Sequence, residues 1–152
     1  MSKILIESMK KVPRILLVED SEGDAALIAE ALENSLVQPE ILVIDDGEEA
    51  LAYLAGEGIF KDVPKPDLIL LDVNLPKVDG KEILVFIKNH KELKRIPVIM
   101  LTTSSLQADI DFSYDNHANC YIVKSGDFKE FNKTISLLEN FWFHSVRYAN
   151  NI

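Results

Sequence analysis

The sequence predicts an α/β domain with a doubly wound, five-stranded parallel sheet. Two observations indicate this fold. Short runs rich in Val, Ile and Leu alternate five times with stretches of helical periodicity. The runs are continuously apolar, which is typical of parallel strands buried on both faces. Right-handed crossovers between such strands would place helices on both sides of the sheet.

The five expected strands share this apolar composition and lie at residues 15–18, 41–44, 68–71, 98–101 and 121–123. The expected helices lie at about 22–35, 48–55, 80–89, 105–117 and from 127 to beyond 143. The fourth helix has the weakest pattern, because its few apolar residues are spread among aspartates. Asp127 is expected to cap or begin the fifth helix. Residues 56–66, with two glycines and two prolines, are expected to form a loop.

Composition limits the possible functions. A chain of 152 residues fits one domain, which we expect at 14–145, with an N-terminal arm at 1–13 and a tail at 146–152. The net charge of -9 and the lack of a basic stripe argue against nucleic-acid binding. No apolar run approaches the roughly 18 residues of a membrane span. The single cysteine, Cys120, cannot form an internal disulfide, so a cytoplasmic protein is expected.

Polar side chains follow four of the five expected strands. Because ligands bind beyond the carboxyl ends of parallel strands, these side chains should gather at one edge of the sheet. Any one of them would more often be a solvated loop residue, a cap or surface charge, but their convergence favours a functional site. They are Glu19 and Asp20, then Asp72, then Thr102 and Thr103, then Lys124.

The chemistry of these groups is that of a cation-assisted phosphoryl transfer. Two carboxylates about 4 Å apart repel by roughly 1 kcal/mol in water and about 4 kcal/mol at an effective dielectric near 20. A hard cation such as Mg2+ removes this repulsion, and Asp20 and Asp72 could bind it, with Glu19 acting directly or through water. Carboxylates are known nucleophiles in aspartyl-phosphate chemistry. Lys124 could neutralise charge on the phosphoryl group, and Thr102 could donate its hydroxyl to it.

At these residues the sequence resembles the receiver domains of two-component response regulators. The matching motifs lie at 17–20, 67–76, 79–80, 97–102 and 121–124, within a resemblance that spans about 14–141. It implies a flavodoxin-like three-layer fold with strand order 2-1-3-4-5. It also implies a stand-alone phosphoacceptor protein, not an enzyme acting on other substrates, that signals through protein–protein contacts.

The resemblance implies a role for each matched residue. Asp72 corresponds to the phosphoacceptor, and Glu19, Asp20, Asp72 and the carbonyl of Asn74 would hold Mg2+, or Mn2+ or Ca2+ in its place. Lys124 and Thr102 would contact the phosphoryl group, while Thr102 and Tyr121 would form the switch pair. Without the resemblance, Tyr121 would be interpreted as a partly exposed strand residue.

A narrower resemblance points to a partner. Residues 114–121 and 141–143 are similar to those of the small regulators paired with cyanobacterial phytochromes. This implies that the phosphoryl donor is a phosphohistidine on a phytochrome-like histidine kinase.

One residue departs from the family pattern. Ser125, followed by Gly126, stands where the family usually has a proline after its lysine, joined by a cis peptide bond. A cis bond before a residue other than proline costs about 2.5–4 kcal/mol. The Lys124–Ser125 bond is therefore expected to be either trans with a reshaped loop, which Gly126 could assist with a positive φ, or cis under strain.

The last helix has two apolar stripes. One, suited to packing on the sheet, contains Phe128, Phe131, Ile135, Leu138 and Trp142. The other contains Leu137, Phe141, His144 and Tyr148, and we expect it to contact a second copy of the chain or a partner protein. In the alternative, the tail folds back and buries these rings within the monomer.

Other functions fit the sequence less well. A haloacid-dehalogenase-type phosphatase needs an aspartate where Asn74 stands. A flavodoxin-type FMN carrier needs a phosphate-binding loop, whereas residues 21–24 are acidic. A dinucleotide-binding domain needs a G-x-G-x-x-G motif, which is absent. The remaining alternative is a pseudo-receiver that acts only as an interaction module, for which Ser125 is the single supporting feature.

Overall fold

The computed structural model describes residues 12–149. Most of the predicted N-terminal arm and the last residues of the predicted tail therefore lie outside the described part. The strands are β1 (Arg14–Val18), β2 (Glu40–Ile44), β3 (Leu68–Leu71), β4 (Val98–Thr102) and β5 (Cys120–Val123). The helices are α2 (Glu22–Glu33), α3 (Gly47–Ala55), α4 (Gly80–Asn89), α5 (Gln107–Asp115) and α6 (Phe128–Glu139), with short turns η1 (Gly58–Phe60) and η2 (Asn140–Ser145).

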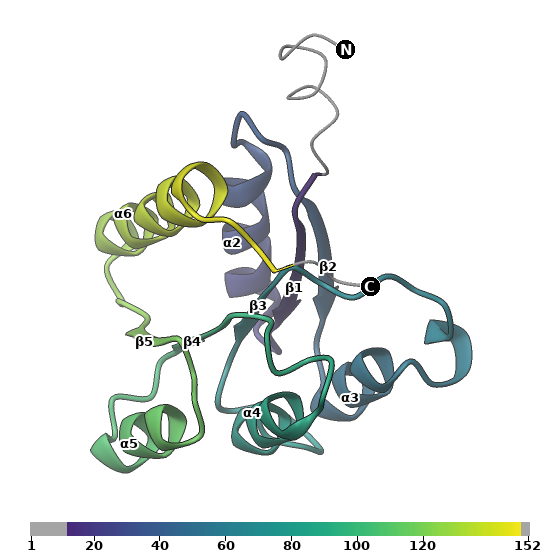
Figure 1. The fold of residues 1–152 in the computed structure, drawn as a ribbon. Helices are drawn as coiled ribbons and strands as arrows, with labels where there is room; N and C mark the ends of the chain where they lie inside the picture. The colour runs from purple at the N-terminus through teal and green to yellow at the C-terminus, as the bar shows by residue number, and fades with distance from the viewer. Residues whose placement is uncertain (1–11, 150–152) are drawn as a thin grey trace, which may run out of the picture.

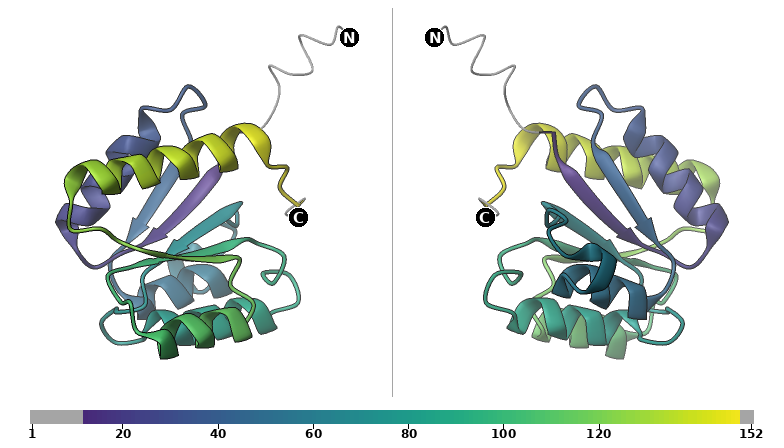
Figure 2. Two further views of the ribbon diagram at one scale, coloured as in Figure 1. Left: turned by 90° about the vertical axis from the view of Figure 1, so that its left-hand side faces the viewer. Right: turned by 90° about the vertical axis from the view of Figure 1, so that its right-hand side faces the viewer.

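The five strands form one parallel sheet in the order β2-β1-β3-β4-β5, which confirms the predicted topology. Helices α2 and α6 cover one face of this sheet, and α3, α4 and α5 cover the other (Figures 1 and 2). All five strands point the same way, so the residues that follow them meet at one edge. No helix among residues 12–149 is long and apolar enough to cross a bilayer.

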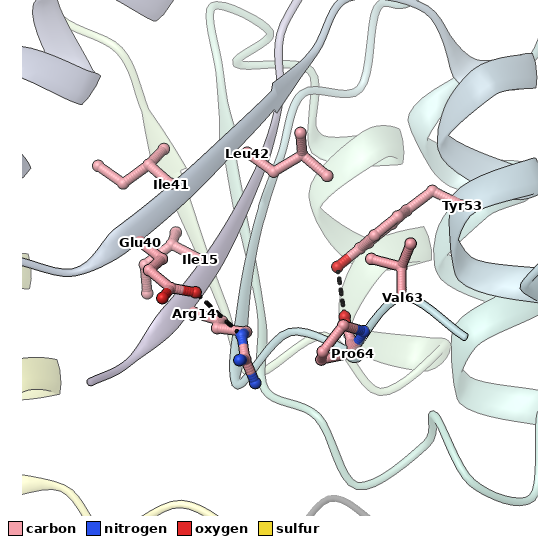
Figure 3. Close-up of a pocket in the computed structure, with 8 residues that line it drawn as sticks. All are labelled: Arg14, Ile15, Glu40, Ile41, Leu42, Tyr53, Val63 and Pro64. Carbon is pink, nitrogen blue, oxygen red and sulfur yellow. Dashed lines mark hydrogen bonds and ion pairs between the residues drawn. The ribbon is translucent and has the colours of Figure 1, made fainter. Parts of the chain in front are cut away.

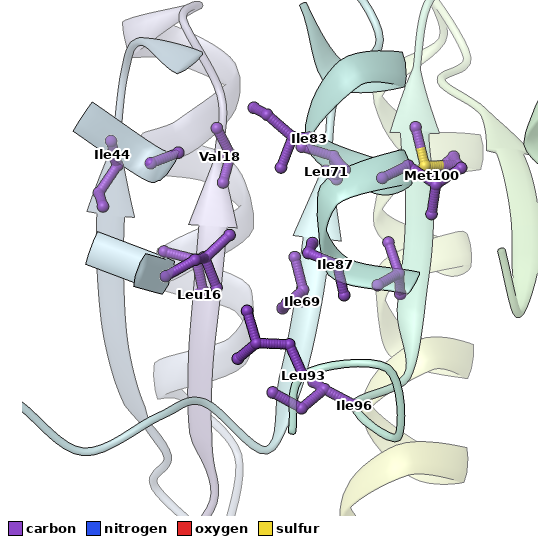
Figure 4. Packing of buried hydrophobic residues seen from close by; sticks show 14 of the residues in the cluster. Leu16, Val18, Ile44, Ile69, Leu71, Ile83, Ile87, Leu93, Ile96 and Met100 are labelled. Carbon is purple, nitrogen blue, oxygen red and sulfur yellow. The ribbon is translucent and has the colours of Figure 1, made fainter. Parts of the chain in front are cut away.

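Two apolar clusters hold the helices on the sheet. Beneath α3 and α4, alternate residues of β1, β3 and β4 pack against helical isoleucines and leucines (Figure 4). On the other face, the remaining strand residues contact α2 and α6. For example, the neighbouring residues Ile69 and Leu70 pack on opposite faces of the sheet and are 0% and 1% exposed. Each such side chain contributes roughly 1.5–3 kcal/mol by burial, so the central strands form a rigid base for the residues that follow them.

The prediction that every strand is buried on both faces is wrong for the two edge strands, β2 and β5. In β2, Leu42 and Val43 are 39% and 41% exposed, and in β5, Val123 is 43% exposed. Their apolar sequences resemble those of the central strands, so composition alone did not reveal their edge positions.

Short polar side chains set the start of four helices. Ser21, Asp46, Asp79 and Asp127 each accept a hydrogen bond from a backbone N–H in the first turn of the helix that follows. A cap of this kind contributes about 0.5–2 kcal/mol. The predicted role of Asp127 is confirmed, since its Oδ1 accepts from the N–H groups of Lys129 and Glu130 at 2.8 and 3.2 Å.

The helix predicted from 127 to beyond residue 143 is present, but its last six residues are not α-helical. The α-helix ends at Glu139, a π-helical turn follows over Asn140–Ser145, and residues 146–149 are not helical. The chain then folds back, so that the Tyr148 ring stacks on Trp142 with centroids 6.4 Å apart. The Tyr148 hydroxyl donates to the Trp142 carbonyl at 2.6 Å. This part of the tail follows the alternative in which the rings are buried within the monomer.

Candidate functional site

The sheet's hydrogen-bond ladder fixes the backbone of the site residues. Glu19 N–H donates to Ile44 O at 3.0 Å, and Asp72 N–H donates to Val18 O at 3.1 Å. On the other side, Lys124 N–H donates to Thr102 O at 2.7 Å. The predicted residues of β1, β3, β4 and β5 are therefore extensions of adjacent strands and lie along one edge.

The Lys124 ammonium lies at the centre of the site. It donates to Glu19 Oε1, to Asp24 Oδ2 at 3.0 Å and to Asp72 Oδ2 at 3.3 Å. The side chains of Lys124, Glu19 and Asp72 are nearly buried, at 4%, 1% and 7% exposed, whereas Asp24 is 36% exposed. The predicted Glu19, Asp72 and Lys124 thus come together, and Asp24 joins them although the sequence analysis did not select it.

Burial and the neighbouring charges shift the pKa values of Glu19 and Lys124 in this cluster. Burial raises the pKa of Glu19 to about 7; the hydrogen bond from Lys124 opposes this rise, and the nearby Asp72 adds to it. Burial lowers the pKa of Lys124, but its contacts with Glu19, Asp72 and Asp24 outweigh that effect and the net pKa is raised. The ammonium therefore stays charged, while the buried Glu19 carboxylate still lacks compensation.

A divalent cation fits this donor set. Glu19, Asp20 and Asp72 each offer a carboxylate oxygen, and these oxygens lie within 4.8 Å of one another. Oxygen donors with excess negative charge are those that Mg2+ and Mn2+ prefer. The residues present therefore suit such an ion. A second acidic group, at Asp45, Asp46 and Glu49, differs because Asp46 caps α3 and lies 3.7 Å from the Lys77 ammonium.

The loop after β3 holds Asp72 in one orientation. Its Oδ1 accepts from the N–H of Asn74 at 3.1 Å, which leaves Oδ2 on the side of Lys124. Gly80, at the start of α4, packs directly on this loop, and a Cβ there would lie 1.9 Å from the Asp72 carbonyl oxygen. A larger residue at position 80 would displace the Asp72 backbone.

The loop after Lys124 forms a turn in which Ser125 stands in place of the family's proline. No peptide bond in residues 12–149 is cis, so the Lys124–Ser125 bond is trans. The suggestion that Gly126 would adopt a positive φ is wrong, since Gly56 and Gly58 are the glycines that do so in the described part. Instead the Ser125 hydroxyl accepts from Asp127 N–H at 3.0 Å and closes a turn. Lys124 still reaches the acids.

The proposed switch residues are linked through Ser104. Thr102 is fully buried, and its Oγ1 accepts from the N–H of Ser104 at 3.3 Å. The half-buried Tyr121 donates its hydroxyl to the Ser104 carbonyl at 2.8 Å. A movement of the Thr102 hydroxyl would therefore reach Tyr121 through a single residue.

The same loop is tied to the helices below it. Asp109 accepts from Ser104 Oγ at 2.6 Å and from the Lys81 ammonium at 3.0 Å. The hydrogen bonds from Ser104 and Lys81 lower the pKa of Asp109 and keep it charged although it is only 8% exposed. This pair is not visible in the sequence, because Asp109 interrupts the apolar pattern of α5 and Lys81 is 28 residues away.

Two hollows border the sheet. One, of about 280 Å³, is lined by Asp24, Leu27, Thr103, Lys124, Ser125, Gly126, Phe128 and Phe131. It gives solvent access to the site between α2 and the start of α6. The other, of about 310 Å³, includes Arg14, Glu40 and Tyr53 and lies where β1 and β2 begin (Figure 3). That second hollow is at the opposite end of the strands from Asp72.

Part of the predicted partner face is exposed, and part of it packs within the monomer. Leu137 and Phe141 are 63% and 56% exposed, and the exposed His144 lies 3.6 Å from a Glu139 oxygen. Tyr148 instead packs inward, where burial raises the pKa of its hydroxyl to about 12. Tyr148 therefore no longer belongs to the predicted face.

Comparisons with known proteins place these features in context. Residues 15–136 match the family model of the response regulator receiver domain. The chain is 46% identical over 132 residues to response regulator Rcp1 of Synechocystis sp., covering 87% of this chain and 90% of that protein. It is 40% identical over 129 residues to the probable methanogenesis regulatory protein FilR2 of Methanothrix harundinacea, covering 84% and 82%.

Solved structures of response regulators also match the fold of this chain. The phosphorylated cyanobacterial phytochrome response regulator RcpA matches with a TM-score of 0.89 at 46% identity, covering 92% of this chain and 100% of that one. The Mn2+-bound form of Rcp1 matches with the same TM-score at 44% identity, covering 91% and 99%.

Proposed function

The chain belongs to the response regulator receiver family, and we propose that Asp72 is the residue on which it accepts a phosphoryl group. The single observation that carries this assignment is the contact of the buried Asp72 Oδ2 with the Lys124 ammonium at 3.3 Å, inside the acidic cluster. A nucleophilic carboxylate beside a fixed cation is the arrangement that phosphoryl transfer requires.

The proposed transfer uses groups that are already in place. An Asp72 carboxylate oxygen forms a bond to phosphorus as the bond from phosphorus to the donor's histidine nitrogen breaks, and the electron pair returns to the imidazole. The product is an acyl phosphate. Lys124 would stabilise the phosphoryl oxygens by charge and hydrogen bonding. Hydrolysis of the acyl phosphate by the domain itself would reset the protein.

A divalent cation would be held by the carboxylates of Glu19, Asp20 and Asp72, with the backbone carbonyl of Asn74 as a further ligand. When bound, it would supply positive charge to the phosphoryl oxygens. Support comes from the Glu19 carboxyl, whose pKa is raised chiefly by burial and further by the neighbouring Asp72, so that a cation beside it would stabilise its charged form. The Mn2+-bound structure of Rcp1 is consistent with this assignment.

We propose that Thr102 and Tyr121 couple phosphorylation of Asp72 to a change at the protein surface. If the Thr102 hydroxyl turns toward the phosphoryl group, it gives up the hydrogen bond from Ser104 N–H. Ser104 also accepts from Tyr121, so its displacement frees the tyrosine ring and alters the face of α5, β5 and α6.

The proposed phosphoryl donor is a phytochrome-like histidine kinase, which would place the protein in the cytoplasm. Support comes from the 46% identity to the phytochrome response regulator RcpA.

We further propose a homodimer through the exposed Leu137 and Phe141, with His144 at the margin. The pseudo-receiver alternative is disfavoured, because Ser125 leaves Lys124 in contact with Asp72.

Intact mass spectrometry after incubation with acetyl phosphate tests the assignment. The wild type should gain one phosphoryl group when Mg2+ is present and none when EDTA is present. Asp72→Asn should gain none while keeping a cooperative unfolding transition. An equal gain in the variant would exclude Asp72 as the acceptor, and no gain by the wild type would favour the pseudo-receiver.

A further inference from the structure

Asp24 contacts the site lysine without belonging to the cation-binding cluster. Its Oδ2 lies 3.0 Å from the Lys124 ammonium. The carboxylates that lie close enough to share an ion there are those of Glu19, Asp20 and Asp72, and Asp24 is not among them. The sequence places Asp24 in the first turn of α2, four residues after Asp20.

The contacts of Lys124 conflict with cation binding. An ammonium has three donor hydrogens, and here they are directed at Glu19, Asp24 and Asp72. Two of these acceptors are the carboxylates that a divalent cation would use. When such an ion binds them, it repels the ammonium and competes with it for the carboxylate oxygens. Asp24 is the one partner of the three that lies outside the cation-binding cluster, so its contact with Lys124 meets no competition from the ion.

Local structure holds Asp24 in position for this role. Its backbone N–H donates to Ser21 Oγ at 3.3 Å, and Ser21 N–H donates to Glu19 Oε2 at 3.1 Å. The first turn of α2 is therefore tied to the end of β1. The helix N-terminus favours a charged carboxylate, and the 36% exposure of Asp24 spares it the desolvation cost that Glu19 bears.

We infer that Asp24 is a positioning residue that retains the Lys124 ammonium beside the site when a divalent cation occupies Glu19 and Asp72. This inference rests on the proposed function. Without Asp24, the ammonium has only the cation's own ligands as acceptors and competes with the ion for them. Loss of Asp24 therefore weakens cation binding and also leaves Lys124 less well placed toward a phosphoryl group.

Isothermal titration calorimetry with MgCl2 tests the inference on the full chain. Asp24→Asn should raise the Kd for Mg2+ about fivefold, the effect of a partly exposed ion pair. Glu22→Gln is the matched control, because it removes the same charge from the same helical turn at an exposed residue, and it should change the Kd by less than about twofold. Asp24→Glu keeps the carboxylate and should restore binding to within about twofold of the wild type.

A second background shows whether Asp24 acts through Lys124. In Lys124→Ala, where no ammonium needs an acceptor, Asp24→Asn should have no more effect than Glu22→Gln has in the wild type. If Asp24→Asn equals Glu22→Gln in the wild-type background, or keeps its full effect without Lys124, the inference is wrong. Should Lys124→Ala not fold, the first comparison and the Asp24→Glu rescue decide.

The wild type separates this inference from the proposed function. If the wild type binds no Mg2+ and takes no phosphoryl group from acetyl phosphate, the proposed function fails. If it does both while Asp24→Asn matches its control, the assignment of Asp72 stands and only the role of Asp24 is lost.

Discussion

Replacing Glu19 with glutamine should make the metal-free protein more stable at pH 8. Glu19 as a whole residue is 2% exposed, and burial, aided by Asp72, raises the pKa of its carboxyl from 4.5 to about 7. The interval of about 2.5 pH units, at ~1.36 kcal/mol each, corresponds to about 3 kcal/mol. Glutamine has the size of the protonated side chain and carries no charge, so it avoids this cost.

The direction in pH follows from where the proton binds more tightly. Because the pKa of Glu19 is higher in the folded state, the folded protein holds this proton more tightly than the unfolded chain does. The favourable contribution is complete below about pH 4.5 and is lost as the pH rises to about 7. The difference between Glu19→Gln and the wild type should therefore be near zero at pH 4.5 and reach about 3 kcal/mol at pH 8.

Urea unfolding in EDTA, followed by circular dichroism from pH 4.5 to 8.5, measures this difference. Glu57→Gln, which removes an exposed charge from a loop, is the control and should follow the wild type across the range. If Glu19→Gln and the wild type lose stability in parallel as the pH rises, then ionisation of the buried Glu19 does not destabilise the folded state. Mg2+ should stabilise the wild type most at high pH, where its ligands are ionised.

Four further variants test the roles of Lys124, of the Asp109–Lys81 pair and of the exposed Phe141. Lys124→Ala should slow phosphorylation by acetyl phosphate roughly a hundredfold while calorimetry still detects Mg2+ binding; an unchanged rate would remove Lys124 from the transfer. Asp109→Ala should lower the free energy of unfolding by about 1.5–3 kcal/mol, and Lys81→Met should add little to it in a double-mutant cycle, whereas full additivity would mean that the two residues do not interact. Phe141→Glu should convert dimers to monomers in sedimentation velocity, and a variant that stays dimeric would place the interface elsewhere.

The sequence predicted the central sheet well, because strands buried on both faces are recognisable by composition alone. The observed bounds of β3 (Leu68–Leu71) and α4 (Gly80–Asn89) are the same as the predicted ones. Polar residues directly after such strands could be assigned to one edge, since parallel strands have their carboxyl ends in common. Glu19, Asp72 and Lys124 are such residues, and Lys124 contacts both acids in the structure.

What the sequence did not reveal depends on tertiary contacts. Asp24 resembles an ordinary first-turn acid until α2 is placed beside Lys124. Asp109 weakened the helical pattern of α5, although its charge is compensated by Lys81 from another helix. The periodicity of the C-terminal residues suggested one continuous α-helix, but the π-helical turn at Asn140–Ser145 changes the direction of the side chains that follow. Tyr148 consequently packs on Trp142 instead of extending the exposed stripe.

Chemical mapping of the phosphorylated residue tests the assignment of Asp72 most directly. The protein is treated with acetyl phosphate and Mg2+, reduced with sodium borohydride, which converts an aspartyl phosphate to homoserine, and sequenced as peptides by tandem mass spectrometry. We expect homoserine at position 72, and none there when EDTA replaces Mg2+. Reduction at Asp20 or Asp24 with Asp72 intact would contradict it, because the nucleophile would then be a residue that we assign to binding or positioning.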